Sequence, residues 1–401
     1  MANVSSSNGL EKRPKLRFPG FDEPYKQCHI GDIYAERSQR GASDMVLLSV
    51  TMNDGVIPRS EIEGKDNSSA DKSNYKVVLM GDMVYNSMRM WQGANGISPY
   101  DGIVSPAYTV LMPKIPISNG YFAALFKSPN LINEFRKNSQ GMTSDTWNLK
   151  YPQIETIKVH IPPLSEQNRV ADMLGTLERR IAKQAQLVEN LKKYKRGVVR
   201  TLLTPYSCCI ADATWTTAKI GDLGSFTKGA PLSKADIAPD GTPFILYGEL
   251  YTTYHEVINA VIRRTKAQPE KQYYSRVGDV VIPTSGETPE EISTAACVML
   301  PDIILAGDLN IFRSSKIDGR IMSYILNHIV NGQIARIAQG KSVVHIQASE
   351  LSKIEISYPD YNTQRKMFKT FDALNTRTEI AQKKLMALRC MQKALLQQLF
   401  M

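Results

Sequence analysis

The 401-residue chain lacks the cysteine and histidine patterns that mark disulfide scaffolds and metal centres. Its five cysteines are an odd number and include no C-x-x-C, and its five histidines form no H-x-x-x-H or H-x-x-E motif. The adjacent Cys208 and Cys209 are compatible with a redox pair, but two reduced thiols in a linker are the simpler interpretation. The sequence therefore predicts neither a disulfide framework nor a metal site.

Long apolar runs are also absent. The first residues, MANVSSSNGLEKRPK, contain no apolar stretch of the kind a secretory signal needs, and no run approaches the roughly 18 apolar residues of a membrane span. We therefore expect a cytoplasmic protein. With 42% hydrophobic and 22% charged residues, the composition is that of a globular chain with roughly two or three domains.

The positive charge is concentrated in short segments. The formal net charge is +10, yet residues 20–160 carry 14 Lys and Arg against 15 Asp and Glu. Residues 161–205 carry 9 against 4, and residues 359–401 carry 8 against 3. A basic balance suggests a polyanionic partner only weakly, because each such lysine is equally well explained as part of a solvated face.

The chain repeats itself at an offset of 197 residues. Segment 157–167 (IKVHIPPLSEQ) aligns without a gap with segment 354–364 (IEISYPDYNTQ), and apolar residues recur at a spacing of three and four after both. So narrow a stripe over about four heptads is typical of a coiled coil. The predicted helix-pairing seam consists of Leu174, Leu177, Ile181, Val188, Leu191, Val198, Leu202, Phe371, Leu374, Leu385, Leu388, Leu395 and Leu399.

Two long helices are therefore expected. The first follows Pro162 and Pro163, with Ser165 as a suitable N-cap, and the second follows Pro359. Each would run for about 38 residues, or roughly 57 Å at 1.5 Å per residue. We expect the two helices to pair in antiparallel fashion, because a large domain lies between them. The alternative is that each helix packs separately on its own domain.

The larger blocks repeat more faintly. Two Gly-Asp pairs, at 81–82 and 278–279, stand between short apolar or β-branched runs, as at turns between strands. Residues 121–137 and 321–330 are helix candidates.

We predict a mixed α/β fold with two pseudo-symmetric globular domains. The predicted divisions are a tail at 1–19, a first domain at 20–160, a helix at 161–205, a second domain at 206–358 and a helix at 359–401.

This order of motifs closely resembles the specificity subunits of type I restriction–modification systems, from about residue 14 to residue 400. The resemblance is carried by 161–174 (IPPLSEQNRVADML), 278–286 (GDVVIPTSG), 306–310 (AGDLN), 81–89 (GDMVYNSMR) and 102–108 (GIVSPAY). No single motif is decisive, but their order, repeated twice with a helix each time, is highly specific. In the second copy of the segment before the helix, Tyr361 and Thr363 stand where the first copy has Leu164 and Glu166. The proline and the glutamine are kept, as Pro359 and Gln364.

The resemblance implies a division of labour between subunits. Two target recognition domains would each read one half of a split double-stranded DNA site, and the helices would set the spacer and dock two methylation subunits. Motor-nuclease subunits would complete the complex. The chain itself would have no catalytic residues and no cofactor, since S-adenosylmethionine, ATP and Mg²⁺ would be bound by the partner subunits.

Candidate DNA contacts follow from the family's loop positions and from the side-chain types that pair with bases. For each of them, a solvated or turn-capping role remains open. They are Arg37, Gln39, Arg40, Asn86, Arg89, Gln92, Gln140 and Thr143 in the first domain, and Thr227, Lys228, Ser233, Lys234, Thr284, Ser285, Gln339, Lys341 and Ser342 in the second.

Two other classes of function fit the sequence less well. A methyltransferase with its own recognition domain would need a second Pro where Ala107 stands in the segment SPAY, and an F-x-G-x-G cofactor loop that we do not find. A nuclease would need a lysine companion for Asp279 and Glu287 in a convincing position. A coiled-coil scaffold without DNA binding would explain the helices but not the two similarly ordered domains.

Overall fold

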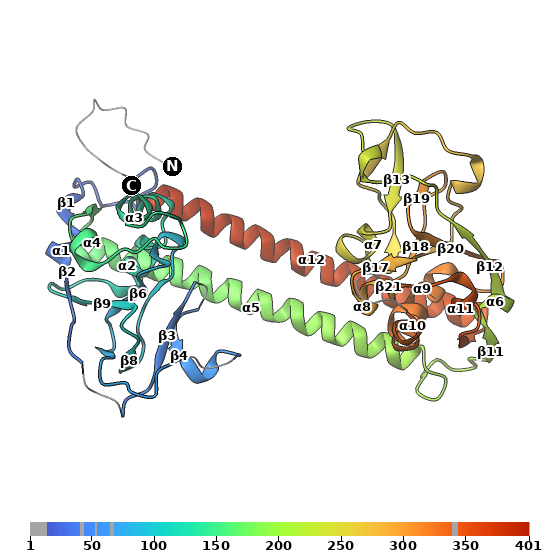
Figure 1. Ribbon diagram of the computed structural model, residues 1–401, viewed down its shortest axis with the longest axis horizontal. Helices are drawn as coiled ribbons and strands as arrows, with labels where there is room; N and C mark the ends of the chain where they lie inside the picture. The colour runs from blue at the N-terminus through green and yellow to red at the C-terminus, as the bar shows by residue number, and fades with distance from the viewer. Residues whose placement is uncertain (1–13, 41–43, 53, 65–67, 339–343, 401) are drawn as a thin grey trace. The chain divides into compact units, whose positions relative to one another are not determined.

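The computed structural model describes residues 14–40, 44–52, 54–64, 68–338 and 344–400 (Figure 1). The chain divides into two compact units, one of residues 1–185 and 383–401 and the other of residues 186–382. Both long helices, α5 (Leu164–Leu202) and α12 (Tyr361–Leu399), contribute one part to each unit. No helix within the described ranges is long and apolar enough to cross a membrane.

The first unit contains a mixed α/β domain. Its central sheet has the antiparallel order β2-β9-β6-β7, and β1–β10, β3–β4 and β5–β8 form small ladders beside it. The elements are β1 (Lys26–His29), α1 (Ile30–Ile33), β2 (Tyr34–Glu36), β3 (Leu48–Thr51), β4 (Gly55–Pro58), η1 (Arg59–Glu61), β5 (Lys76–Val78), β6 (Met83–Asn86), η2 (Met90–Gln92), β7 (Asn95–Ile97), β8 (Gly102–Val104), β9 (Tyr108–Pro113), α2 (Asn119–Leu125), α3 (Pro129–Asn138), α4 (Tyr151–Ile154) and β10 (Lys158–Ile161).

The second unit is also mixed α/β, with a five-stranded sheet in the order β12-β20-β16-β18-β14 and a three-stranded sheet in the order β15-β13-β19. Strands β11–β22 and β17–β21 pair separately. The elements are β11 (Trp215–Lys219), α6 (Ile220–Leu223), β12 (Gly224–Lys228), η3 (Lys234–Asp236), β13 (Thr242–Leu246), α7 (Glu249–Thr252), β14 (Val257–Ile258), β15 (Arg263–Thr265), η4 (Lys271–Tyr273), β16 (Asp279–Pro283), β17 (Ser285–Gly286), α8 (Pro289–Ile292), β18 (Ala296–Val298), β19 (Ile304–Ala306), β20 (Leu309–Ser314), α9 (Gly319–His328), α10 (Asn331–Ile337), β21 (Val344–His345), α11 (Ala348–Leu351) and β22 (Glu355–Pro359).

Both units use the same plan, so the predicted fold class is confirmed. In each, a strand, a one-turn helix and a second strand open the domain, and the domain closes with the strand that leads into a long helix. The two one-turn helices, α1 and α6, both begin with Ile-Gly-Asp, at 30–32 and 220–222, and their packing explains the glycine. A Cβ on Gly31 would lie 2.9 Å from Cβ of Glu155, and one on Gly221 would lie 2.9 Å from Cβ of Ser352, so both positions exclude a side chain.

One predicted helix candidate divides in two. Residues 121–137 fall into α2 and α3, because Pro129 begins a new helix that Ser128 caps by accepting a hydrogen bond from the backbone N–H of Leu131. The candidate at 321–330 is a single helix, α9.

A buried glutamine fastens the start of each long helix to the domain before it. Gln167 accepts a hydrogen bond from the backbone N–H of Ser118 (3.1 Å) and donates one to the carbonyl of Pro162 (3.0 Å). Gln364 does the same with Asp318 (2.9 Å) and Pro359 (2.8 Å). The two bonds need a free backbone carbonyl just before the helix, a position that suits proline, and an amide side chain inside the helix. This requirement explains why Pro and Gln persist in both copies of the segment.

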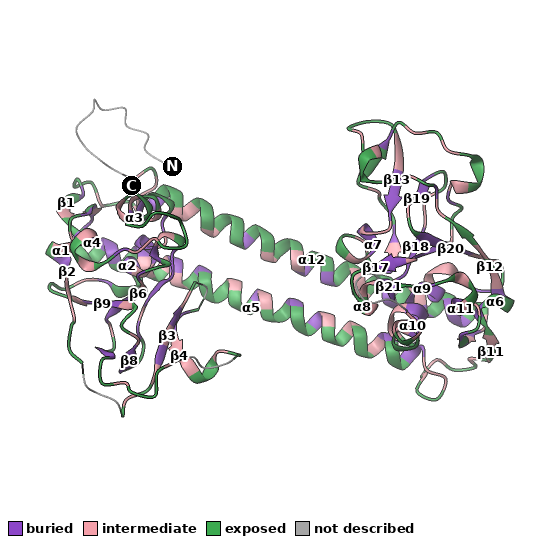
Figure 2. Cartoon of the chain, viewed as in Figure 1, coloured by how far each residue is buried: buried purple, intermediate pink, exposed green. Residues whose placement is uncertain are grey.

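The long helices share an apolar core with each other and with a domain inside each unit. In the first unit Leu174 of α5 belongs to the cluster that contains Leu395 and Leu399 of α12. In the second, Leu202 of α5 shares a cluster with Phe371 of α12. The start of one helix thus meets the end of the other in both units, which is an antiparallel arrangement. Figure 2 shows both long helices largely green, with separate purple and pink patches along their length.

None of the predicted seam residues is exposed. The buried ones are Leu174, Leu177, Val188, Leu191, Leu202, Phe371, Leu388 and Leu399, and the half-buried ones are Ile181, Val198, Leu374, Leu385 and Leu395.

Candidate nucleic-acid interface

Two of the predicted segments in each domain lie at one edge of its central sheet. Strands β2 and β6 both run antiparallel to β9, so their carboxyl ends lie at the same edge. Strands β12 and β16 flank β20 in the same way. The predicted segments at 37–40 and 284–285 follow β2 and β16, and those at 86–92 and 227–234 begin with the last residues of β6 and β12. Sheet topology therefore brings together residues that are about 50 positions apart in sequence.

In the second domain, three predicted residues line one hollow. Lys228, Ser233 and Thr284 surround a space of about 450 Å³ together with Asp308. The ammonium group of Lys228 donates to Oδ1 of the buried Asn310 (2.9 Å). Burial lowers the pKa of Lys228, and the negative charge of Asp308 acts in the opposite direction. The hollow thus presents a fixed donor and an acceptor side by side.

The other predicted residues of the second domain differ in exposure. Ser285 is buried, and its hydroxyl donates to Oδ2 of Asp308 (2.7 Å), so it holds Asp308 in place. Thr227 and Lys234 are exposed, and Ser233 caps the short helix η3. Gln339, Lys341 and Ser342 lie outside the described residues.

In the first domain, aromatic stacking joins two of the predicted segments. The rings of Trp91 and Trp147 meet edge to face with centroids 5.2 Å apart. This contact places the exposed Arg89 and Gln92 close to the loop that carries Gln140 and Thr143. Gln140 forms a β-bridge with Asn148, and Thr143 bonds to Thr146. The side-chain oxygen of Asn86 accepts from the backbone N–H of Met88 (3.0 Å), which is a turn-capping role.

Arg37 is committed to an ion pair inside the fold. Its Nε and Nη2 donate to the two carboxylate oxygens of the buried Asp82, at 2.6 and 3.1 Å. The guanidinium is thus engaged by this carboxylate, whereas Gln39 and Arg40 of the same segment are exposed. The guanidinium of Arg40 makes a long contact of 3.5 Å with the side chain of Asn74.

The second domain contains the same kind of pair. Arg313 donates from Nε to Oδ1 of Asp279 (2.8 Å) and from Nη2 to Oδ2 (2.9 Å). Each aspartate follows a glycine in the left-handed region, with φ of +92° at Gly81 and +96° at Gly278, and each also accepts a backbone N–H from the start of its turn. The Gly-Asp motif is therefore a turn whose carboxylate is neutralised by an arginine from another strand. This accounts for Asp279 without a catalytic role.

Replacement of Asp279 by alanine is expected to destabilise the second domain by about 3 kcal/mol, because the largely buried guanidinium of Arg313 would be left without its counter-charge. Urea unfolding followed by circular dichroism measures the loss. Asp222→Ala is the matched control, since Asp222 also follows a glycine but is exposed. Equal stability losses in the two variants would contradict this role for the ion pair.

Asp308 and Asn310 are functional candidates that the sequence-based list omitted. Asp308 stands after a third glycine with positive φ, Gly307 at +79°, and it lines the same hollow as Lys228. The repeated Gly-Asp signal was available at 307–308 in the sequence. What the sequence could not indicate is that this aspartate is exposed, whereas Asp82 and Asp279 are buried.

Comparisons with known proteins agree with the resemblance found in the sequence. The chain matches the family model described as "Type I restriction modification DNA specificity domain" twice, over residues 39–193 and 213–389. It is 22% identical over 397 residues to the type I restriction enzyme MjaVIII specificity subunit of Methanocaldococcus jannaschii, covering 92% of this chain and 89% of the relative.

Two solved structures have the same fold. One is the crystal structure of a type I restriction-modification S subunit from M. genitalium, with a TM-score of 0.60, 13% identity and coverage of 97% of this chain and 99% of the other. The second, from work on complex assembly and conformational transition of the type I R-M system, has a TM-score of 0.60, 15% identity and coverage of 95% and 98%. The chain belongs to the type I restriction–modification DNA specificity family, as a specificity subunit with two copies of the domain.

Proposed function

We propose that each domain reads one half of a split DNA site with the loops at its sheet edge, and that the helices set the spacer between the halves. The observation that carries this proposal is the duplicated sheet edge, where loops rich in hydrogen-bonding side chains follow β2 and β6 in one domain and β12 and β16 in the other. Sequence is read by a few such side chains on base edges, whereas phosphate contacts supply affinity.

The most favoured base contacts are those that combine exposure with a fixed position. Lys228 and Asp308 in the second domain, and Arg89 and Gln92 in the first, meet this condition. Lysine and arginine suit guanine, glutamine suits adenine and aspartate suits cytosine. The ion pair of Arg37 with Asp82 favours a supporting role for Arg37 behind the contacting loops.

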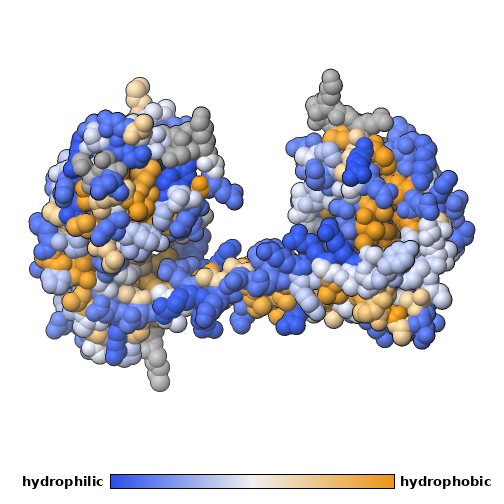
Figure 3. Space-filling model, turned by 90° about the horizontal axis from the view of Figure 1, so that it is seen from below, coloured by the Kyte–Doolittle hydropathy of each residue, from blue (hydrophilic) through white to orange (hydrophobic). Residues whose placement is uncertain are grey.

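The outer faces of the helices are the proposed docking sites for two methylation subunits. These faces carry exposed apolar side chains, which neither the domains nor the helix seam cover. Their neighbours are mostly hydrophilic (Figure 3). A partner helix would bury them, which would remove their exposed apolar surface from water. They are Leu187 and Tyr194 on α5 and Ile380, Met386 and Met391 on α12.

Catalysis would reside in the partners of this chain. Methylation subunits would bind S-adenosylmethionine, and motor-nuclease subunits would bind ATP and Mg²⁺, within a cytoplasmic complex on double-stranded DNA. The basic excess of residues 161–205 and 359–401 supports contact of the helices with phosphates or with acidic patches of the partners. No cofactor is assigned to this chain.

The test is single-molecule sequencing of adenine methylation in cells that express this chain with a methylation subunit, compared with cells that lack this chain. We expect a split motif, two short defined halves around a fixed run of unspecified bases, only when the chain is present. A complex with the methylation subunit that forms on gel filtration but methylates no chain-dependent motif would refute the proposal.

A further inference from the structure

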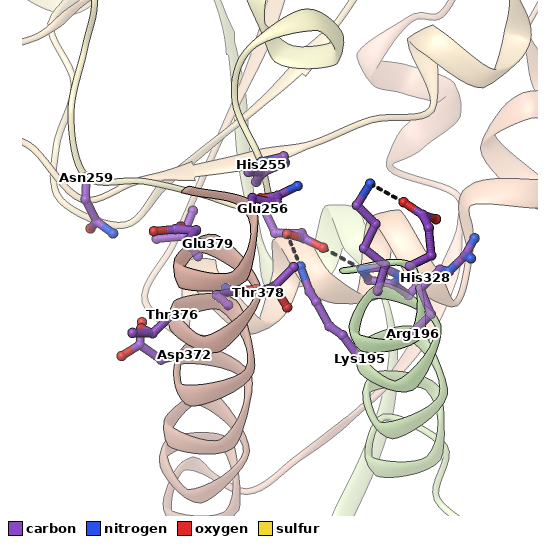
Figure 4. Close-up of a pocket in the computed structure, with 15 residues that line it drawn as sticks. Lys195, Arg196, His255, Glu256, Asn259, His328, Asp372, Thr376, Thr378 and Glu379 are labelled. Atoms are coloured by element: carbon purple, nitrogen blue, oxygen red, sulfur yellow. Dashed lines mark hydrogen bonds and ion pairs between the residues drawn. The ribbon is translucent and has the colours of Figure 1, made fainter. Parts of the chain in front are cut away.

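A charged cluster is buried in the second unit where α5, α9, α12 and the loop before β14 come together (Figure 4). Oε2 of Glu256 accepts a hydrogen bond from the ammonium of Lys195 (2.9 Å), and Oε1 lies 2.8 Å from Nε2 of His328. The side chains of Lys195, Glu256 and His328 are only 15%, 11% and 13% exposed. The carboxylate of Glu256 therefore binds the ammonium of Lys195 on α5 and the imidazole of His328 on α9 at the same time.

Contacts around the cluster extend it to the other long helix. The ring of Tyr324 stacks on His328, and its hydroxyl accepts from the side-chain amide of Asn375 on α12 (2.6 Å). The Lys195 ammonium lies 5.7 Å from the centre of the same ring. Both long helices are thus connected to α9 and to Glu256 through polar groups.

The backbone of Glu256 is fixed as firmly as its side chain. Its carbonyl accepts hydrogen bonds from the hydroxyl of Ser323 (2.6 Å) and from the backbone N–H of Cys297 (2.9 Å). Burial raises the pKa of Glu256, but the hydrogen bond from His328 and the charge of Lys195 outweigh burial and lower the pKa to about 2. The carboxylate is consequently ionised at neutral pH. Hydrogen bonds thus fix Glu256 both at its side chain and at its backbone carbonyl.

The second domain and the long helices do not fill the space beside the cluster. A hollow of about 530 Å³ lies beside the cluster, lined by polar groups that include Arg196 and His255 as well as the cluster itself. Close-packed apolar side chains would fix the angle between domain and helices through their shapes. The apolar contact around Leu202 and Phe371 is interrupted here by a polar hollow, so the directional bonds of Glu256 add a restraint that packing does not supply at this place.

The first unit has a different pair at the positions related by the 197-residue offset. Lys195 corresponds to Gln392 and Asn375 to Glu178, and the half-buried Gln392 donates to the exposed Glu178 at 3.4 Å. Among the described residues, the buried cluster therefore belongs to the second domain.

Buried ion pairs seldom add net stability, because the cost of desolvating two charges offsets their attraction. A neutral pair of similar volume is often tolerated without loss, whereas removal of one partner is costly. In this unit the contacts of Glu256 with Lys195 and His328 are short and directional, so they favour one geometry of the domain on the helices. This property suits a domain whose orientation on the helices has to be constant.

We propose that Glu256, held by Lys195 and His328, is the positioning residue that fixes the second recognition domain on its stretch of the helices and so restricts the spacer length that the subunit accepts. The inference rests on the proposed function, because spacer length has meaning only for a split site. It assigns Glu256 no contact with DNA.

The test is the double variant Lys195→Met/Glu256→Gln, which replaces the ion pair by neutral groups of similar volume. Complexes with the methylation subunit would be given DNA with the native half-sites and spacers of native length or one base longer or shorter. We expect the ratio of methylation at the native spacer to that at the altered spacers to fall at least about tenfold. The bases read should not change, and Lys195→Arg should retain most of the wild-type ratio.

The matched control is Glu189→Gln/Lys192→Met. This pair lies on the same helix, six and three residues before Lys195, and its side chains are 60% and 44% exposed. It should leave the ratio unchanged. A stable double variant with wild-type spacer discrimination would overturn the inference, and so would a large loss of thermal stability in that variant, since the cluster would then be a stability element. Absence of any chain-dependent motif with wild-type protein would instead refute the proposed function.

Discussion

Replacement of residues 26–161 by the corresponding block of a relative is expected to change one half of the recognised DNA site completely and to leave the other half unchanged. The block begins with β1 and ends with β10, which pair with each other, so both strands are exchanged together. It contains the whole β2-β9-β6-β7 sheet and the loops at its edge. The measurement is the methylated motif, determined by single-molecule sequencing.

The exchanged block should fit the rest of the chain. The hydrogen bonds between the block and the start of α5 use backbone groups of the block, and the nearby ion pair is formed by residues outside it. Gln167 bonds to the backbone N–H of Ser118, so the incoming block needs only the same fold at that position. Arg17 and Glu166 both lie outside the block and keep their bidentate ion pair, at 2.9 Å for each contact. Tyr25, just before the block, also keeps its contact with Glu166.

The reciprocal exchange of residues 215–359, from β11 to β22, is the control, and it should change only the other half-site. If either exchange altered both halves, the two domains would not be independent readers. If neither altered the motif, the sheet-edge loops would not be the reading surface.

Features with a periodic or repeated signal could be predicted from the sequence. The 3–4 spacing of residues such as Leu174 and Phe371 is set by helix geometry alone, so the helices and their seam could be anticipated without knowing what else they touch. The shared Pro and Gln before each helix were recognisable because one bonding pattern, Gln167 to Pro162 and Gln364 to Pro359, was needed twice.

The remaining features depend on contacts between residues far apart in the chain. Arg37 has the right chemistry for a base contact, and only the fold reveals that Asp82, 45 positions later, holds its guanidinium. The cluster around Glu256 joins Lys195 and His328, which are 61 and 72 positions away. Neither residue belongs to a local motif, so no pattern in the sequence could identify their association.

Insertion of four residues into each long helix, between Ala185 and Gln186 and between Gln382 and Lys383, is expected to lower methylation at the native spacer at least about 100-fold. These points are the boundaries between the two compact units, so each unit keeps its own core and its sheet-edge loops. Four residues lengthen a helix by about 6 Å and turn it by about 40° beyond a full turn. At 3.4 Å per base pair, 6 Å is almost two base pairs, which neither half-site contact can absorb.

The bases read in each half should stay the same, and any remaining methylation should move to a longer spacer, because the insertion alters neither β2 and β6 nor β12 and β16. A four-residue insertion into the loop after α5, at residues 208–212, adds the same length outside the helices and should leave the motif intact. Native-spacer methylation that survived the helix insertion would show that the helices do not measure the spacer. Altered bases at an unaltered spacer would show that the helices contribute to base recognition, which would remove the separation between reading and measuring on which the proposed function depends.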